Sequence, residues 1–298
     1  MSVPTTDRMG TAAAAVRHHY DVGNEFYRLW LDETLTYSCA LRESPDDTLE
    51  LAQQQKLRFH LDAIGAARAE TVLDIGCGWG SILRELSRRH SVPRSVGLTL
   101  SPAQAEYVTA QEYSGVEVHT KNWLEFEPDT RFDGIISIGA FEHFARPTDS
   151  TDEKIAVYRD FLTRCRDWLT ERGTLSLQTI AYANMSREQA SSFMQQEIFP
   201  DADLPTPAEI VAAADGIFEI VTLRNDRLDY AWTCEQWARR LRSRRAEAVA
   251  VVGEEVVARY ERYLKLSALG FRMGKIGLLR VVLRPYPSRF FGGEDPRG

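Results

Sequence analysis

Residues 72–80 read VLDIGCGWG, an apolar run that ends in glycines at alternate positions. Glycine permits a tight turn and lets the backbone approach a ligand closely. The stretch SILRELSRRH that follows has the composition of a helix, and a helix N-terminus offers free N–H groups to a bound molecule. The order of strand, glycine loop and helix therefore predicts a ligand-binding loop in an α/β fold.

Around this loop, short runs rich in β-branched residues alternate with helical stretches. The expected strands are TVLDIG, RSVGLTL, VEVHT, FDGIISIG, GTLSLQTI, FEIVTLRND and GLLRVVLRP. This alternation is typical of a doubly wound, mostly parallel sheet with helices on both faces. We predict a single domain that consists of a disordered start at 1–16, a helical lid at 17–66, a cofactor-binding core at 67–181, a substrate-side cover with terminal strands at 182–284, and a tail at 285–298.

The composition argues against nucleic-acid-binding, zinc-binding and membrane-spanning proteins. The chain has 298 residues and a formal net charge of -7, from 36 Lys and Arg against 43 Asp and Glu. That balance disfavours non-specific nucleic-acid binding, which requires the neutralisation of phosphates. The 4 cysteines lie too far apart for a CxxC pair or a zinc site, and no apolar run reaches the roughly 20 residues of a membrane span. The sequence therefore predicts a cytoplasmic protein without a metal site.

Two details of the glycine loop favour S-adenosylmethionine over a dinucleotide. Asp74 precedes the glycines, where it can meet the ammonium group of the ligand. The spacing is G-x-G-x-G, whereas dinucleotide sites use G-x-G-x-x-G. Neutral hydrogen-bonding residues follow the second strand, where an acid often binds ribose. The predicted cofactor contacts in these segments are Asp74, Gly76, Gly78, Gly80, Thr99, Leu100 and Gln104, with Asn122 and Trp123 bordering the adenine.

Several motifs taken together resemble the cyclopropane-fatty-acid and mycolic-acid cyclopropane synthases. They are, in order, HYDVGNEFYRLWLDETLTYSCA, VLDIGCGWG, VGLTLSPAQ, SIGAFEHF, EIFPDADLP and DYAWTCEQW. The resemblance extends over residues 17–284, almost the whole chain. It implies an S-adenosylmethionine-dependent methyltransferase with a seven-stranded, Rossmann-like sheet, a terminal antiparallel strand and a lid of N-terminal helices.

The resemblance also implies an active site and a reaction. Members of the family methylate an alkene carbon of a lipid, which gives a cyclopropane or a methyl branch, and hold a bicarbonate ion beside the sulfonium methyl group. The residues implied around this ion are Glu142, the backbone of Ile138 and Gly139, Cys39, Tyr230 and Gln178. Tyr37 and Ser38 are implied as cofactor contacts from the lid.

Two features depart from the family pattern. Gln178 stands where the family usually carries a histidine that helps to hold the bicarbonate, and an amide takes no proton at neutral pH. The segment after Thr179 is shorter than in the mycolic-acid enzymes. A second hypothesis therefore keeps the cofactor but replaces the alkene with a small amine or an electron-rich ring carbon. A third is a cofactor-binding protein without catalysis.

The acceptor is expected to be a lipophilic or small molecule, either free, carried on an acyl carrier protein, or held as a phosphate ester. The candidates for an apolar tunnel are Phe26, Trp30, Phe193, Phe199 and Phe271. The run ARRLRSRRAEA at 238–248 is either a solvated helix face balanced by glutamates or a dock for an acidic carrier. We expect His143 to be structural and His19 to belong to the lid.

Overall fold

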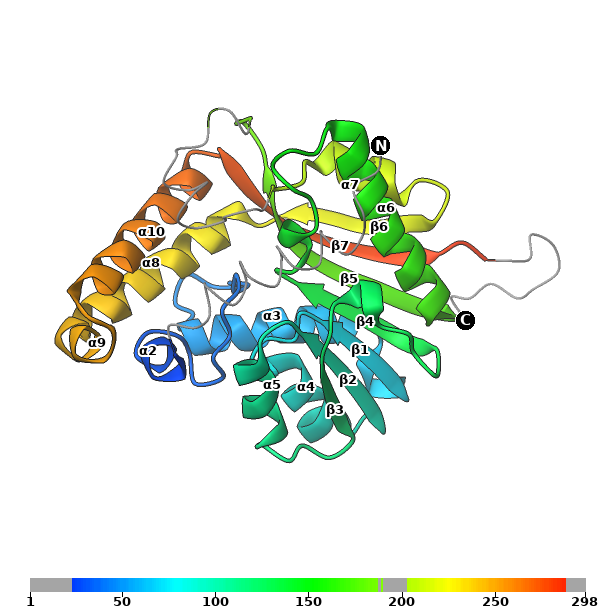
Figure 1. Cartoon of the computed structure of the whole chain (residues 1–298), viewed down its shortest axis with the longest axis horizontal. Helices are drawn as coiled ribbons and strands as arrows, with labels where there is room; N and C mark the ends of the chain where they lie inside the picture. The colour runs from blue at the N-terminus through cyan, green and yellow to red at the C-terminus, as the bar shows by residue number, and fades with distance from the viewer. Residues whose placement is uncertain (1–22, 187–188, 190–202, 288–298) are drawn as a thin grey trace.

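The computed structural model describes residues 23–186, 189 and 203–287. Its centre is a seven-stranded sheet in the order β3-β2-β1-β4-β5-β7-β6 (Figure 1). The strands are β1 (Thr71–Ile75), β2 (Arg94–Thr99), β3 (Val116–Thr120), β4 (Phe132–Ile138), β5 (Leu169–Tyr182), β6 (Phe218–Asn225) and β7 (Ile276–Pro285). The predicted doubly wound α/β class is confirmed.

The pairing of the strands explains their composition. β1 pairs in parallel with β2 and with β4, so that Leu73 lies between Val96 and Ile135. Parallel strands are covered on both faces and therefore read as nearly continuous apolar runs. β7 lies antiparallel between β5 and β6. This strand is the terminal antiparallel strand that the family resemblance implied.

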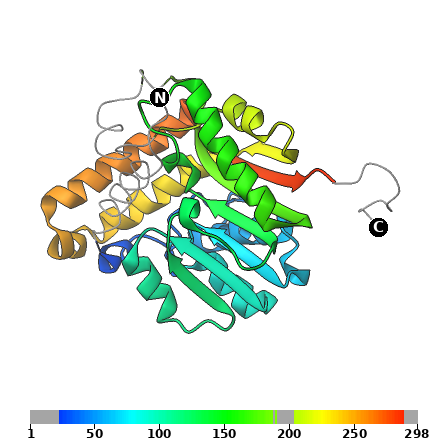
Figure 2. The same ribbon diagram turned by 45° about the vertical axis from the view of Figure 1, so that its right-hand side comes forward.

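Helices cover both faces of the sheet (Figures 1 and 2). One face carries α3 (Leu49–Ala63), α4 (Ser81–Glu85) and α5 (Pro102–Thr109), with the short helices η1 (Ala66–Arg68) and η2 (Leu86–His90). The other face carries α6 (Thr151–Trp168) and α7 (Pro207–Ala214). Each layer has its own buried cluster, which includes Leu83 and Val108 on the first face and Tyr158 and Phe161 on the second. The sheet therefore separates two apolar cores.

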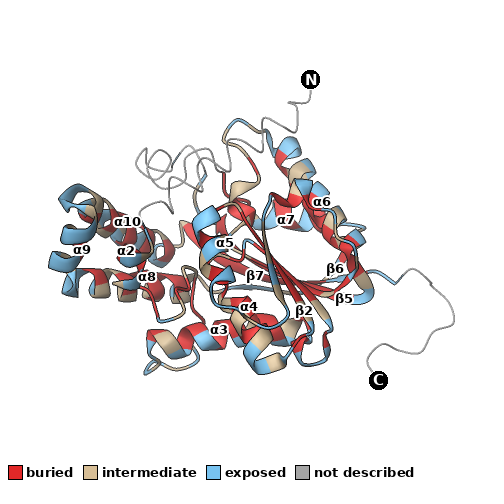
Figure 3. Cartoon of the chain, turned by 60° about the horizontal axis from the view of Figure 1, so that its bottom comes forward, coloured by how far each residue is buried: buried red, intermediate tan, exposed pale blue. Residues whose placement is uncertain are grey.

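A third cluster lies beyond the sheet and joins the two ends of the described chain. It packs α2 (Asn24–Arg28) against α8 (Arg227–Ser243), α9 (Arg245–Val252) and α10 (Glu254–Arg272) (Figure 1). The Phe26 and Tyr260 rings meet edge to face, with centroids 4.9 Å apart, and the hydroxyls of Tyr27 and Tyr260 lie 2.8 Å apart. Buried residues run through α2, α8 and α10, whereas α9 is mostly exposed (Figure 3). Helices from the N-terminal and C-terminal parts of the described chain thus pack together in one hydrophobic cluster.

Local sequence explains where several helices begin. A serine or threonine side chain accepts a hydrogen bond from the first turn of α3, α5, α6 and α7, and these caps are Thr48, Ser101, Ser150 and Thr206. In α6 and α7 a glutamate three positions on returns the bond, which completes a capping box. Such caps stabilise a helix by about 1 kcal/mol each.

Some predictions fall outside the described residues. They are the disordered start at 1–16, the lid role of His19, the tunnel residues Phe193 and Phe199, and most of the tail. The division of the single domain into lid, core and cover stays a prediction. Among the described residues, no helix combines the length and the apolar character that a membrane span requires.

Candidate active site

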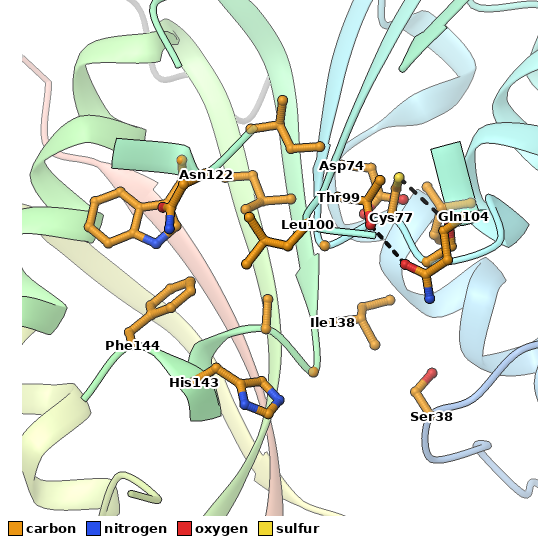
Figure 4. Close-up of a pocket in the computed structure, with 18 of the residues that line it drawn as sticks. Ser38, Asp74, Cys77, Thr99, Leu100, Gln104, Asn122, Ile138, His143 and Phe144 are labelled. Carbon is orange, nitrogen blue, oxygen red and sulfur yellow. Dashed lines mark hydrogen bonds between the residues drawn. The ribbon is translucent and has the colours of Figure 1, made fainter. Parts of the chain in front are cut away.

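A cavity of about 460 Å³ opens at the carboxyl ends of β1, β2 and β4. All the predicted cofactor contacts except Gly80 line it: Tyr37, Ser38, Asp74, Gly76, Gly78, Thr99, Leu100, Gln104, Asn122 and Trp123. Figure 4 shows Asp74, Gln104 and Ser38 on one side of the cavity and Asn122, His143 and Phe144 on the other. The fold therefore brings the predicted contacts from distant segments to one place.

The glycine loop is shaped by close packing at Gly76. Its φ is +83°, and a Cβ atom there would lie 2.8 Å from the Cβ of Ala140. The N–H groups of Gly76 and Cys77 both donate to the Leu98 carbonyl at 2.9 Å. Because an L side chain would be strained in this conformation and would also collide with Ala140, only glycine fits at this position.

Gly80, predicted as a cofactor contact, packs against α5. It lies outside the cavity lining, at the residue that precedes α4, with φ +78°. A Cβ atom there would lie 2.8 Å from Cγ2 of Val108 in α5. The glycine at position 80 is thus explained by the packing of the loop against α5, without a ligand.

Asp74 ends β1 at the cavity and has a buried cationic neighbour. Burial raises the pKa of Asp74 to about 7, and the charge of Lys56 opposes that rise. Lys56 lies in α3, lines the same cavity and is 1% exposed. Its Nζ donates to Ser38 Oγ at 3.0 Å. Lys56 was not among the predicted contacts, although a lysine on the buried face of an amphipathic helix is a signal that could have identified it.

The neutral residues after β2 form a small hydrogen-bonded group. Thr99 Oγ1 donates to Gln104 Oε1 at 2.7 Å and accepts from the N–H of Ser101 at 3.1 Å (Figure 4). These contacts hold the Gln104 side chain against the end of β2. Since the Gln104 oxygen already accepts a bond, its amide nitrogen is the group that can reach a ligand.

The opposite wall of the cavity is more apolar. Asn122 caps the short helix η3 (Trp123–Glu125) through a 3.0 Å bond from the N–H of Leu124. The Trp123 ring packs on Phe144 at 5.2 Å between centroids. Burial lowers the pKa of His143 to about 4, so this imidazole is neutral at pH 7. A neutral His143 agrees with the structural role expected of it.

Glu142 lies in η4 (Phe141–His143), directly after β4, and is 3% exposed. Its Oε1 accepts a 2.6 Å hydrogen bond from the N–H of Ile180. Its Oε2 is buried and makes no well-formed hydrogen bond in the described part of the chain, although the Thr179 side chain lies close enough to lower the pKa of the carboxyl. Burial raises the pKa of Glu142 to about 7, against the lowering effect of the Ile180 N–H. The neighbours Gly139 and His143 line the cofactor cavity, although Glu142 itself does not.

Arg280 of β7 donates hydrogen bonds to two of the implied active-site residues, Gln178 and Cys39. It was not among the predicted site residues. Its fully buried guanidinium donates from Nε to Gln178 Oε1 at 2.9 Å and from one terminal nitrogen to the Cys39 carbonyl at 3.3 Å. Its other terminal nitrogen pairs with the Asp226 carboxylate. His60 approaches the same Gln178 oxygen at 3.3 Å. Gln178 therefore faces α3 and β7 and does not line the cofactor cavity.

Cys39 and Tyr230 do not line the cofactor cavity, and Tyr230 lies within electrostatic range of both Cys39 and Glu142. Burial raises the pKa of Cys39 to about 12, so the thiol is neutral and is no nucleophile at pH 7. Burial also raises the pKa of Tyr230, and Cys39 and Glu142 lie close enough to contribute to that rise when they are ionised. The Tyr230 ring stacks on Phe271 with centroids 4.5 Å apart. Within the described ranges, no group of three or more His, Cys, Asp or Glu side chains is placed to hold a metal.

The strand order and the cavity after β1 are those of the S-adenosylmethionine-dependent methyltransferases. The mycolic acid cyclopropane synthase CmaA1, solved with SAH and CTAB, superposes with a TM-score of 0.81 and 33% identity, covering 91% of this chain and 97% of its own. The cyclopropane synthase MmaA2 from Mycobacterium tuberculosis superposes with a TM-score of 0.80 and 34% identity, covering 94% and 98%.

Sequence comparison gives the family directly. The family model described as mycolic acid cyclopropane synthetase matches residues 7–281, and the chain belongs to this family. Cyclopropane mycolic acid synthase 2 of Mycobacterium bovis is 35% identical over 269 residues, which are 84% of this chain and 87% of the relative. The predicted family is confirmed, and with it the predicted enzyme class and its cofactor, S-adenosylmethionine.

Proposed function

We propose that this enzyme transfers the methyl group of S-adenosylmethionine to an alkene carbon of a lipophilic molecule. The observation that supports this best is Glu142, a buried carboxyl with a pKa of about 7 and an unpartnered oxygen, between residues that line the cofactor cavity. Methylation of a nitrogen lone pair needs mainly positioning. Methylation of an alkene also needs a group that accepts a proton near neutral pH.

The reaction balances without a further reagent. The alkene π electrons attack the methyl carbon, the carbon–sulfur bond breaks, and its electron pair stays on the sulfur of S-adenosylhomocysteine. A carbocation remains on the neighbouring carbon. When a C–H bond of the transferred methyl group gives its electrons to that carbon, a cyclopropane forms and one proton leaves. Loss of a proton from another carbon gives a methyl branch instead.

The residues around Glu142 suit a cationic intermediate. Tyr230 and Phe271 present stacked rings beside the implied site, and Trp237 meets Tyr230 edge to face at 6.1 Å. Aromatic faces attract a developing positive charge. Phe26, Trp30 and Phe271, predicted for an apolar tunnel, are instead packed on other aromatic rings inside the cluster beyond the sheet and do not line the cofactor cavity. The structure of the relative CmaA1 with CTAB agrees with a lipophilic acceptor.

We propose that the bicarbonate ion implied by the family resemblance lies beside Glu142. Glu142 Oε2 is buried without a partner and would accept a hydrogen bond from the ion. Tyr230 lies within electrostatic range of both Cys39 and Glu142. When bound, bicarbonate supplies a base close to the transferred methyl group.

The surroundings of Gln178 favour one alternative, methyl transfer to a small amine or ring carbon. Its side-chain oxygen is held by Arg280 and His60, and its amide takes no proton at neutral pH. The site therefore lacks the histidine that the family pattern implies as a support for bicarbonate. An acceptor that needs no separate base is compatible with that difference.

The arginine run at 238–248 supports the solvated-face interpretation better than a carrier dock. Arg240 pairs with Glu50, Arg244 with Glu247, and Arg245 with Glu254. Surface pairs of this kind are already neutralised and contribute little stability. We therefore favour a free lipophilic acceptor over a carrier-bound or phosphorylated one. A cytoplasmic location stays a prediction.

Bicarbonate dependence separates the two candidate reactions. Purified enzyme is incubated with S-adenosylmethionine and either a lipid with a cis double bond or a panel of small amines, in buffer depleted of bicarbonate and in buffer supplemented with it. Formation of S-adenosylhomocysteine with the lipid, stimulated by bicarbonate, supports alkene methylation. Turnover with an amine alone, indifferent to bicarbonate, would contradict it.

A further inference from the structure

Lys56 is a buried ammonium group with one hydrogen-bond acceptor among the described residues. It lies in the middle of α3, is 1% exposed, and lines the cofactor cavity. An ammonium group has three N–H donors, and the described residues provide one hydrogen-bond acceptor for it, Ser38 Oγ at 3.0 Å. Lysine is almost never fully buried unless it is paired. The uncompensated donors therefore point to a missing anionic partner in the cavity.

No carboxylate of the described residues forms an ion pair with Lys56 within 4.0 Å. Asp32 is the carboxylate with the largest electrostatic effect on Lys56, but its oxygens form hydrogen bonds with other groups. It accepts from the N–H of Thr34 at 3.0 Å and from the N–H of Thr36 at 2.9 Å. Burial is the main cause that lowers the pKa of Lys56 to about 7, and Asp32 and Asp74 only partly offset it. Burial of the charged form of Lys56 beside the cavity is therefore unfavourable without an anionic partner.

Asp74 lines the same cavity with the opposite charge. It ends β1, is 3% exposed, and interacts electrostatically with Lys56. The aminoacyl end of S-adenosylmethionine carries one ammonium and one carboxylate group, so it matches a cavity wall with one anion and one cation. Ser38 lies at the same wall and already bonds Lys56.

We propose that Lys56, supported by Ser38, binds the carboxylate of the aminoacyl end of the cofactor, while Asp74 binds its ammonium group. The proposal rests on the function proposed above only through the identity of the cofactor. It assigns Lys56 a role in discrimination: the enzyme selects adenosyl ligands that carry a free carboxylate. A purely structural lysine, which only holds Ser38 and the lid in place, would not select for the carboxylate.

The test compares two ligands that differ in the carboxylate alone, S-adenosylhomocysteine and its decarboxylated analogue. Calorimetry of the wild-type protein should give an affinity for S-adenosylhomocysteine at least about 10-fold higher, since hydrogen bonds between charged groups contribute about 1.5–3 kcal/mol. Lys56→Met keeps the apolar stem and removes the charge. It should lower affinity for S-adenosylhomocysteine about 10- to 100-fold and leave affinity for the decarboxylated analogue within about 3-fold.

Gln53→Met is the matched control. Gln53 lies on the same helix and donates to the backbone carbonyls of Ser38 at 2.9 Å and Thr36 at 3.3 Å, so its loss loosens the same lid segment without removing a charge. It should weaken both ligands equally. If Lys56→Met does not fold, Lys56→Gln, which keeps a donor for Ser38, replaces it.

Three results would overturn the proposal: equal wild-type affinities for the two ligands, equal losses in Lys56→Met, or no loss in that variant. These results leave the proposed reaction intact. By contrast, a wild-type protein that binds neither ligand would contradict the cofactor, and with it the proposed function.

Discussion

Arg280 donates a 2.9 Å hydrogen bond from Nε to Oε1 of Gln178, across the antiparallel pairing of β7 with β5. The same guanidinium reaches the carbonyls of Cys39 and Ala40 in the segment between α2 and α3. One buried side chain thus fixes the last strand, the strand beside the active site, and the segment that carries the predicted cofactor contacts Tyr37 and Ser38. We therefore expect the positions of these three segments relative to one another to depend on the Arg280 side chain.

Replacement of Arg280 should therefore be severe. Arg280→Met leaves the Asp226 carboxylate, only 9% exposed, without its buried partner. Loss of one member of a buried ion pair costs about 3–5 kcal/mol in free energy of unfolding, which urea titration can measure. Arg224 pairs with the other oxygen of Asp226 but is 43% exposed, so Arg224→Met should cost less than about 1 kcal/mol. Similar losses in the two variants would contradict the central role of Arg280.

Glu142 should make stability depend on pH. Its pKa is near the usual 4.5 in the unfolded chain and about 7 in the folded protein, so the folded state binds more protons between these values. Stability from this group is therefore greatest in acid and is lost as the pH rises through about 7. Glu142→Gln should increase the free energy of unfolding by about 1–3 kcal/mol at pH 8 and change it little at pH 4.5. If Glu142→Gln is destabilised at both pH values, the Glu142 carboxylate must form stabilising hydrogen bonds in the folded protein, which would contradict an unpartnered Oε2.

Gly76 should tolerate no side chain. Gly76→Ala places a Cβ atom 2.8 Å from the Cβ of Ala140 at a φ of +83°, and both effects displace the loop that bounds the cavity. We expect affinity for S-adenosylhomocysteine to fall by more than about 100-fold, as clash and strain together cost about 3 kcal/mol or more. Gly65→Ala is the control, because Gly65 has a φ of +66° but no atom within 4 Å of the added Cβ. Equal affinities in the two variants would contradict this account of the loop.

Asp74 should make cofactor binding sensitive to acid. The carboxylate must be ionised to bind an ammonium group, and its pKa is about 7. The affinity for the decarboxylated analogue, which carries the amine alone, should fall by up to about 10-fold per pH unit below pH 7. The charge on Lys56 rises in the same range and acts in the same direction. Asp74→Asn should bind more weakly at pH 8 and lose most of this dependence, as calorimetry at several pH values would show.

Much of the fold follows from local sequence patterns. The strand from Thr71 to Ile75 and the glycines after it are adjacent in the chain, so composition and spacing predict both the strand and the loop. The same holds for the β-branched runs of the other strands. Gly80 shows the limit of this reasoning, because its contact is with Val108, a residue on a different helix. A glycine pattern cannot separate a ligand contact from close packing.

The buried polar residues are the part that the sequence does not reveal. Lys56 and His60 lie in α3 and Arg280 lies in β7, and their partners are 18, 118 and 102 positions away along the chain. Helical periodicity places Lys56 on the inner side of α3, but only the packing of α3 against the sheet shows that it meets the cavity. The placement of Gln178 between Arg280 and His60 likewise depends on tertiary structure.

The most direct test of alkene methylation is the fate of the methyl hydrogens. The enzyme is incubated with a cis-unsaturated lipid and S-adenosylmethionine whose methyl group is CD₃, and the product is analysed by mass spectrometry. Ring closure predicts that the product loses one deuteron from the transferred group and retains the other two. A lipid product that retains the complete CD₃ group would replace ring closure with methyl branching, and a labelled amine with no labelled lipid would contradict the proposed reaction.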